Sequence, residues 1–329
     1  MELSPPKTLF VEITSECNSR CKYCHMWSLK DGADRLRTEE KLRLVKDFSR
    51  LNPNGEVVLT GGEPFLKLEE VFDLFQLCRG VGLICSINTN GSTITQDVVD
   101  RLISSGPNHL VISLDSHEPE VHDFHRGVSG GFENTKALIL RLVAKKSAQQ
   151  QSQTEFIINT VITSLNLKDL DQTLRFAESL GVDGVTLQML SPTFYRMGQY
   201  DKFFENYFFS DKPAAINFIQ EIIDGYDTYP LLRTTPADLF WMQKYIINPL
   251  HTVMPICNSH ERNIIIDHVG DVRLCFNMSK IMSGEVLGNV RKDTLGDLWR
   301  GEVSRRARIL MKECRLSCGM LNCHRNKSL

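Results

Sequence analysis

The ten cysteines of this 329-residue chain are unevenly placed, and their spacing is the feature most able to do chemistry. Cys17, Cys21 and Cys24 form a C-x3-C-x2-C cluster. Five more follow residue 256, namely Cys257, Cys275, Cys314, Cys318 and Cys323. Ten cysteines are about 3% of the chain, far below a disulfide-dense scaffold. They therefore favour thiols that bind metal, apart from Cys78 and Cys85, whose apolar contexts predict core positions.

The first cluster directly follows an apolar run, 9–13, that predicts a strand. Loops at the carboxyl ends of strands are where α/β folds place active sites. Three thiolates this close can hold one metal centre. A tetrahedral zinc ion would need His25 or a distant fourth ligand, whereas a four-iron cluster held by three cysteines leaves one iron open to a ligand.

Predicted strands and helices alternate along the first 190 residues, and they position this loop. Short, nearly continuous apolar runs predict buried parallel strands. These runs are Leu9–Ile13, Val57–Thr60, Leu83–Asn88, Leu110–Leu114, Phe156–Ile162 and Val185–Leu190. Amphipathic stretches between them predict helices, the first with Thr38 as N-cap, the second closed by Gly80, and others near 96–104, 131–145 and 167–179. Six βα units are too few for a complete eight-fold barrel, which leaves an open partial barrel or a doubly wound sheet.

The segment after the second run contains residues that suit a ligand. Gly61 and Gly62 allow the backbone to approach a ligand closely, and Pro64 stiffens the turn. Glu63 could accept a hydrogen bond from an ammonium group. Further along, Ser113 and Asp115 at the end of the fourth run suit either ligand contact or the N-cap of the next helix. Arg126 suits either a ligand contact or a surface salt bridge.

Together these motifs resemble the radical S-adenosylmethionine (SAM) superfamily. The cysteine spacing with Tyr23 before the third cysteine is similar to that family's cluster motif, and 60–64 resembles its GGEP motif, whose backbone holds the methionyl amino group. The segments 88–91, 112–115 and 122–127 also resemble SAM-contacting segments. The resemblance implies a four-iron cluster on the first three cysteines. It implies the following SAM-binding residues: Tyr23, Gly61, Gly62, Glu63, Pro64, Asn88, Asn90, Ser113, Asp115 and Arg126.

The second cysteine set resembles the C-terminal auxiliary-cluster domain of that superfamily, in its SPASM or shorter twitch form. A β-hairpin is predicted at 264–267 and 271–275, which brings Cys275 back toward Cys257, and a helix at 295–312 precedes the last cysteines. The ending, C-x3-C-x4-C, departs from the full SPASM pattern. We therefore expect one auxiliary four-iron cluster on four of the five cysteines, with zinc as the alternative. One of Cys314, Cys318 and Cys323 is then left without a metal. We expect its thiol either to be buried among apolar side chains or to donate a hydrogen atom to the substrate radical.

These patterns predict an α/β chain with a partial (β/α)6 TIM-like barrel and a small C-terminal α+β domain. The expected boundaries are a radical SAM core at 1–192, a helical, aromatic-rich connector at 193–256 and the auxiliary-cluster domain at 257–329. Residues 194–209 hold eight aromatics, which predict either a helix packed between two domains or a wall that contacts substrate. Residues 149–153 predict a polar surface loop.

The resemblance implies an enzyme that cleaves SAM reductively to a 5′-deoxyadenosyl radical and abstracts hydrogen from its substrate. We expect a small sugar-like or cyclitol-like substrate, because only eight residues precede the first strand and leave no room for a leader-peptide domain. Net oxidation through the auxiliary cluster is the favoured outcome. The alternatives are a radical epimerase with a cysteine hydrogen donor and a peptide-modifying maturase. A non-catalytic electron carrier would need no SAM-binding motif.

Composition sets the remaining expectations. The net charge is −2, which gives no basic bias toward nucleic acid or anionic membrane. No run of 18 apolar residues and no signal-peptide pattern is present in the sequence, so a cytoplasmic protein is expected. The expected partners are the substrate and an external one-electron reductant such as flavodoxin or ferredoxin.

Overall fold

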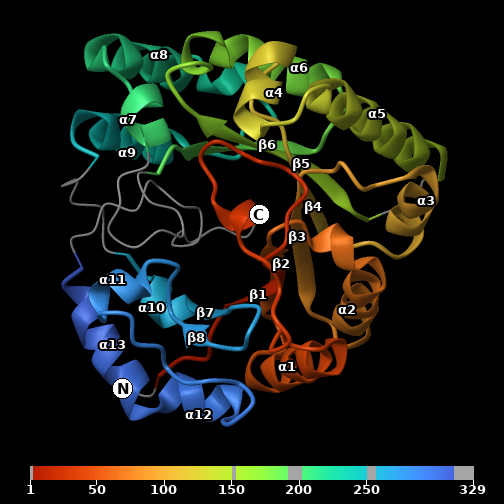
Figure 1. Cartoon of the computed structure of the whole chain (residues 1–329). Coiled ribbons are helices and arrows are strands. Elements are labelled where there is room, and N and C mark those ends of the chain that lie inside the picture. Colours follow the sequence, from red (N-terminus) through yellow and green to blue (C-terminus); the bar gives the residue numbers. More distant parts are fainter. Residues whose placement is uncertain (1–2, 150–152, 192–201, 250–256, 315–329) are drawn as a thin grey trace.

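The protein is described here from a computed structural model that covers residues 3–149, 153–191, 202–249 and 257–314. Its centre is a sheet with the strand order β6-β5-β4-β3-β2-β1-β7-β8. The strands are β1 (Thr8–Thr14), β2 (Glu56–Gly61), β3 (Ile84–Thr89), β4 (His109–Ser113), β5 (Glu155–Ile162), β6 (Gly184–Met189), β7 (Asn263–Ile266) and β8 (Val272–Arg273). Strands β1 to β6 are parallel and curve into an open barrel, as Figure 1 shows.

Helices cover the outside of this barrel (Figure 1). Those of the βα units are α1 (Thr38–Leu51), α2 (Leu68–Gly80), α3 (Gln96–Ser105), α4 (Pro119–Arg126), α5 (Gly131–Gln149) and α6 (Leu170–Ser179). Further along the chain come α7 (Lys202–Tyr207), α8 (Lys212–Asp224), α9 (Pro236–Ile247), α10 (Ser259–Arg262), α11 (Met278–Ile281), α12 (Leu295–Arg300) and α13 (Glu302–Lys312). In the described parts of the chain, no helix has the length and apolar character needed to cross a membrane.

Side chains alternate between the two faces of each strand, and the two faces lie in different surroundings. On β1, Leu9, Val11 and Ile13 are fully buried in the core beneath the outer helices. Thr8 and Phe10, on the other side of β1, line the barrel interior. The six predicted strands are confirmed to within one residue at either end, because their buried residues leave short, largely apolar runs. The predicted α/β fold with a partial barrel is confirmed.

The C-terminal part is joined to the barrel through the same sheet. The predicted hairpin is present as antiparallel β7 and β8, but β7 also pairs in parallel with β1 and extends the main sheet. The prediction of a single helix at 295–312 is wrong, because the chain forms two helices there, α12 and α13, with a break at Gly301. Gly301 is extended (ψ 167°), and a Cβ there would lie 2.9 Å from the carbonyl of Asp297.

Both expected helix caps differ from the structure. Gly80 is the last residue of α2, and Val81 is its C-cap. Thr38 is the first residue of α1 and not its N-cap, because its hydroxyl donates to Glu70 Oε2 at 3.0 Å. Arg37 takes the N-cap position, where its backbone N–H donates to Glu40. The polar loop expected at 149–153 falls mostly on 150–152, which lie outside the described residues, as do 194–201 of the aromatic stretch. The three domain boundaries stay predictions.

Candidate active site and metal centres

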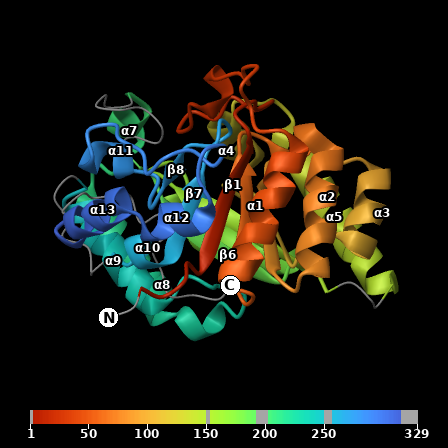
Figure 2. The ribbon, with the colours of Figure 1, turned by 90° about the horizontal axis from the view of Figure 1, so that it is seen from below.

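The loop that follows β1 carries the first three cysteines. It lies at the end of the sheet to which the parallel strands point, as Figure 2 shows. Cys17, Cys21 and Cys24 all line one cavity of about 730 Å³ that continues into the barrel interior. Cys21 is buried, and the other two are half-buried. The fold thus brings together the three thiols that the spacing predicts as ligands of one centre.

The glycine pair after β2 clamps this loop from one side. The backbone N–H of Gly62 donates to the carbonyl of Thr14 at 2.8 Å, and that of Glu63 donates to the carbonyl of Glu16 at 2.8 Å. Gly61 has φ +123°, and a Cβ at Gly62 would lie 1.9 Å from the carbonyl oxygen of Glu16. The close approach expected at these glycines is therefore made to the cysteine loop itself.

Glu63 is fully engaged with its neighbours. Its carboxylate accepts hydrogen bonds from the backbone N–H groups of Phe65 (3.1 Å) and Asn90 (2.8 Å) and from the hydroxyl of Thr89 (2.8 Å). Burial raises its pKa to about 6 against the effect of these donors. The side chain thus fastens the GGEP turn to the end of β3, where it also lines the cavity.

A buried polar network holds the loop from the other side. Tyr23 donates its hydroxyl to Asp115 Oδ2 at 2.7 Å, and Arg126 Nε lies 2.9 Å from the same oxygen in an ion pair. Arg126 Nη1 also donates to Cys21 Sγ at 3.8 Å. Burial disfavours the charged carboxylate of Asp115, but Arg126, His125, His122 and the backbone N–H of Val161 together outweigh it and lower the pKa. The end of β4, the cysteine loop and α4 are joined through the side chains of Tyr23, Asp115, Arg126 and Cys21.

Eight of the ten residues predicted to bind SAM line the cavity, and their role as SAM contacts stays a prediction. Pro64 and Asp115 are buried behind the lining. The alternative role as N-cap does not apply to Ser113 or Asp115, because Glu118 is the N-cap of α4. The alternative for Arg126, a surface salt bridge, does not apply either, because its partner Asp115 is fully buried.

The first site suits an iron–sulfur cluster in its donor chemistry. Burial raises the pKa of the Cys17 thiol to about 11 and that of Cys24 to about 12, so the protein alone does not produce thiolates there. Thiolate ligation needs a metal charge to release these protons. Across the described ranges, no three His, Cys, Asp or Glu side chains are placed to hold a single metal ion. A zinc ion with bonds of about 2.3 Å to sulfur needs its thiolates within about 4 Å of one another. Three thiols spread around one cavity suit a larger cluster.

Sequence reasoning missed a charged network behind the loop. Asp31 accepts hydrogen bonds from the Thr14 hydroxyl (2.6 Å) and the Ser15 backbone N–H (2.8 Å). Asp31 also forms an ion pair with Arg35. Lys41, with no exposed surface, donates to the carbonyl of Ile13 at 2.8 Å and to Glu70. The position of a lysine at helical spacing from Leu44, Val45 and Phe48, on the apolar face of α1, is the signal that could have found it.

The second cysteine set is only partly within the described residues, because Cys318 and Cys323 lie outside them. Cys257, Cys275 and Cys314 are half-buried and form no disulfide. Burial first, and the neighbouring Cys314 as well, raise the pKa of Cys257. Two residues after Cys257, the Ser259 hydroxyl donates to the carbonyl of Leu274, next to Cys275, at 2.7 Å. The three elements that carry these cysteines are thus gathered in one place. Which four of the five bind a cluster stays a prediction.

The described part of the aromatic stretch packs against the first site. Phe203 and Phe204 of α7 are buried in a cluster with Val161 and Leu190. The ring of Phe203 meets that of Tyr23 edge-on at 6.1 Å. Neither phenylalanine lines the cavity. Within 202–209, this favours the packing role over a direct substrate wall.

Comparison with known sequences identifies the family. Residues 11–177 match the Radical SAM superfamily, and residues 257–324 match an iron–sulfur cluster-binding domain, SPASM. The chain belongs to the radical SAM superfamily. It therefore binds S-adenosylmethionine and an iron–sulfur cluster in its barrel and carries an auxiliary iron–sulfur domain.

The curated relatives differ in activity. The chain is 30% identical to an AdoMet-dependent heme synthase of Methanosarcina barkeri over 57% of its own length, and spans about half (52%) of that relative. It is 24% identical to a probable GTP 3′,8-cyclase of Methanocaldococcus jannaschii over 67% of its length and 74% of the relative. A tungsten-containing aldehyde ferredoxin oxidoreductase cofactor-modifying protein of Pyrococcus furiosus is 23% identical over 90% of this chain and 81% of its own.

Solved structures show the same fold. SuiB of Streptococcus suis, bound to S-adenosylmethionine, superposes with a TM-score of 0.72 over 96% of this chain and 74% of its own, at 17% identity. The AdoMet-bound structure of anSMEcpe gives a TM-score of 0.67 over 98% of this chain and 92% of its own, at 19% identity. At such identities the likeness extends to the architecture alone.

Proposed function

We propose that this protein abstracts hydrogen from a small, hydroxyl-rich substrate of the sugar or cyclitol type and oxidises it by two electrons, with the auxiliary centre as electron acceptor. The bound cluster and SAM supply the radical chemistry. The cysteine loop, the GGEP turn and the residues at the ends of β3 and β4 would hold them at the top of the cavity. The substrate would occupy the barrel interior beneath.

The lining of the barrel interior is the observation that supports this substrate class. Inward-facing side chains from β2 to β6 include seven neutral hydrogen-bonding groups, which alternate with apolar valines and an isoleucine and lie beside the acidic Glu56: Thr60, Ser86, Asn88, Ser113, Asn159, Thr186 and Gln188. Within the described ranges, the side chains of Asn88, Ser113 and Gln188 make no hydrogen bond. Asn159 accepts from Thr186 at 3.0 Å, and its own amide N–H groups have no partner among described residues. A substrate with several hydroxyls would satisfy these groups.

Two alternatives remain. A radical epimerase would require a free cysteine beside the substrate, and two of its three candidates, Cys318 and Cys323, lie outside the described residues. A peptide substrate is suggested by the structural neighbours, since SuiB is also known in a complex with the precursor peptide SuiA, and anSMEcpe in complexes with peptides. Those complexes are properties of the neighbours, and the unpartnered hydrogen-bonding groups of Asn88, Ser113 and Gln188 support the small substrate.

Deuterium transfer tests the proposal. The reconstituted protein is incubated anaerobically with dithionite, SAM and size-separated fractions from host cells grown on deuterated carbon source. We expect deuterated 5′-deoxyadenosine with the low-mass fraction and a product two hydrogens lighter than its substrate. Transfer from the peptide fraction, or a product of unchanged mass, would contradict the proposal.

A pair of variants ties the result to the barrel interior. Gln188→Leu removes an inward-facing amide of β6, and we expect the KM for the active fraction to rise by about tenfold for one lost hydrogen bond. Gln220→Leu, on the exposed side of α8, is the matched control and should leave KM unchanged. Equal KM values for the two variants would mean that the side chains lining the barrel interior do not support a hydroxyl-rich substrate.

A further inference from the structure

One arginine beside the second cysteine set is buried with most of its donors unused. Arg308, on α13, is only 7% exposed. Its Nε donates to the backbone carbonyl of His260 at 3.0 Å. Its terminal nitrogens, Nη1 and Nη2, are buried and have no hydrogen-bond partner among the described residues. The planar fork of the guanidinium is therefore left without an acceptor.

No carboxylate balances the charge of this guanidinium. Within the described ranges, Arg308 forms no ion pair. Burial lowers the pKa of Arg308 to about 10, while Glu261 favours the charged form, so the group stays a cation at neutral pH. The carboxylate of Glu261 lies 3.5 Å from His260 Nε2. Because a buried charge without a partner is strongly destabilising, we expect an anion to complete this site.

Contacts with two helices hold the guanidinium in place. Its Cζ lies 4.1 Å from the centre of the Trp299 ring of α12. That ring is fully buried, and its indole N–H donates to the carbonyl of Ser4 at 3.0 Å. Stacking on one face and the hydrogen bond at Nε to α10 leave the edge with Nη1 and Nη2 for an anion.

The arginine lies between two stretches that carry cysteines. Helices α10 and α13 lie side by side in both views of the ribbon (Figure 1 and Figure 2). Cys257 precedes His260 by three residues, which span at most about 11 Å of backbone. The buried face of α13 includes Arg308 and Met311, and the backbone N–H of Cys314 donates to the carbonyl of Met311 at 3.1 Å. The guanidinium is thus close to the two stretches that supply Cys257 and Cys314.

An iron–sulfur cluster with thiolate ligands is an anion that fits this place. The match to the iron–sulfur cluster-binding domain, residues 257–324, includes Arg308 and both of these cysteines. Thiolates and sulfides give such a centre a net negative charge, which grows on reduction, and charge and hydrogen bonds to sulfur set its potential. We propose that Arg308 is the counter-charge of the auxiliary iron–sulfur centre, donates hydrogen bonds from Nη1 and Nη2 to its sulfur atoms, and raises its reduction potential.

This inference deepens the proposed function, and its meaning for catalysis rests on that function. In the proposed oxidation, the substrate radical loses one electron to the auxiliary centre and one proton to water, and becomes a carbonyl compound. A fixed positive charge beside the acceptor favours this electron transfer, because it stabilises the more negative, reduced form. Arg308 does not line the cavity, so it is a positioning residue that acts through the centre.

Redox titration tests the proposal without SAM or substrate. The background is the full chain with Cys17→Ala/Cys21→Ala/Cys24→Ala, which keeps only the second centre. Reconstituted protein is titrated with redox mediators and followed by electron paramagnetic resonance. We expect Arg308→Met to lower the ratio of reduced to oxidised centre at a fixed potential by about tenfold, which corresponds to about 59 mV for one electron. Arg308→Lys keeps the charge and should restore most of this loss.

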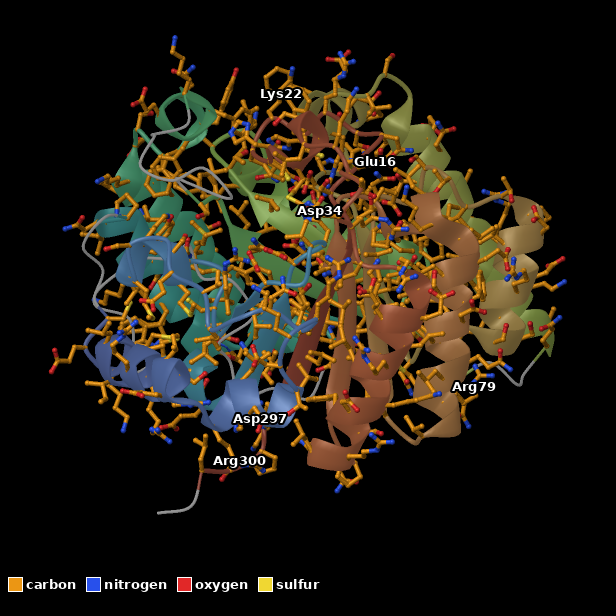
Figure 3. All side chains as sticks on the ribbon, turned by 60° about the horizontal axis from the view of Figure 1, so that its bottom comes forward. Glu16, Lys22, Asp34, Arg79, Asp297 and Arg300 are labelled. Carbon is orange, nitrogen blue, oxygen red and sulfur yellow. The ribbon has the colours of Figure 1, made fainter. Side chains whose placement is uncertain are left out.

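Arg300→Met is the matched control for this titration. Arg300 follows Trp299 in the chain, but it is exposed and lies at the outer edge of the molecule, as Figure 3 shows. Its loss should leave the potential of the centre unchanged. An unchanged potential in Arg308→Met, or an equal shift in Arg300→Met, would overturn the proposal.

Unfolding with and without iron separates this role from a purely structural one, and it also decides the case in which Arg308→Met does not hold its iron. In iron-free protein, Arg308→Met removes an unpaired buried cation and should unfold at the same or a higher denaturant concentration than its parent. In reconstituted protein it should unfold at a lower one. Equal destabilisation with and without iron would mean that Arg308 only supports the packing of α13, against the proposal. Failure to find a two-electron oxidation product would contradict the proposed function and leave both measurements unaffected.

Discussion

The two cysteine sites of this chain are held in place in different ways. The loop of Cys17, Cys21 and Cys24 is fastened by the backbone of the GGEP turn, by Asp31 and by the Asp115–Arg126 pair. In the second site, Cys257 precedes α10, Cys275 lies between β8 and α11, and Cys314 follows α13. Two hydrogen bonds link these stretches within the described residues: the Ser259 hydroxyl donates to the carbonyl of Leu274, and Arg308 Nε donates to the carbonyl of His260. From the described residues we expect the barrel to shape its site in advance, and the C-terminal site to depend more on the metal that it binds.

The largest expected effect separates the two sites by function. Cys21→Ala should abolish 5′-deoxyadenosine formation from SAM, because it removes a ligand of the first centre. Cys275→Ala should retain uncoupled cleavage, because that thiol belongs to the other site. Liquid chromatography of anaerobic reactions measures the product, and circular dichroism controls for folding. Full cleavage by the Cys21 variant would refute the division of labour.

A second prediction concerns the fastening of the first site. Asp115→Ala leaves the buried Arg126 without its partner, and we expect the free energy of unfolding to fall by about 3 kcal/mol. Denaturant titration measures the loss. Asp47→Ala, which breaks the exposed pair with Arg50, is the matched control and should cost under about 1 kcal/mol. Similar losses in the two variants would show that the network does not hold the loop.

Removal of iron should affect the two sites unequally. After chelation, we expect backbone amides of β7, β8 and α13 to exchange hydrogen for deuterium faster, while those of β1 and β2 keep most of their protection. The reason is that metal binding supplies part of the folding energy of the C-terminal site, whereas the barrel core is apolar and fully buried. Exchange followed by mass spectrometry measures this. Uniform loss of protection across the chain would contradict the expectation that the two sites depend unequally on their metal.

The smallest effect concerns the contact between the two regions. Arg291 binds Glu40 of α1 at 2.7 Å, and this hydrogen bond, against burial, lowers the pKa of Glu40 from 4.5 to about 2. Because the folded pKa is depressed, the contribution is complete above pH 4.5 and is lost as the pH falls toward 2. Calorimetry between pH 5 and pH 3 should show a larger drop in Tm for the native protein than for Arg291→Gln. Parallel curves would mean that the pair does not link the regions.

The sequence predicted the strands and the cysteine loop well for a physical reason. The buried residues of each strand leave a short, largely apolar run, and a thiol cluster after such a run is a local pattern. The arrangement around the loop depends on contacts between distant residues. The pairing of β7 with β1 and the bond from buried Lys41 to the carbonyl of Ile13 have no local signature of this kind. The ion pair of Asp115 with Arg126 also could not be predicted, because the two residues become neighbours only in the folded chain.

Iron content tests the central claim, two separate iron–sulfur sites, most directly. Anaerobically reconstituted native protein should hold about eight iron atoms per chain, as expected for two four-iron centres. The triple variant Cys17→Ala/Cys21→Ala/Cys24→Ala should keep about half of them, while Cys78→Ala, which changes a core thiol outside both sites, should keep them all. Native protein that binds about four iron atoms and one zinc ion when fully reconstituted would contradict the account of the second site.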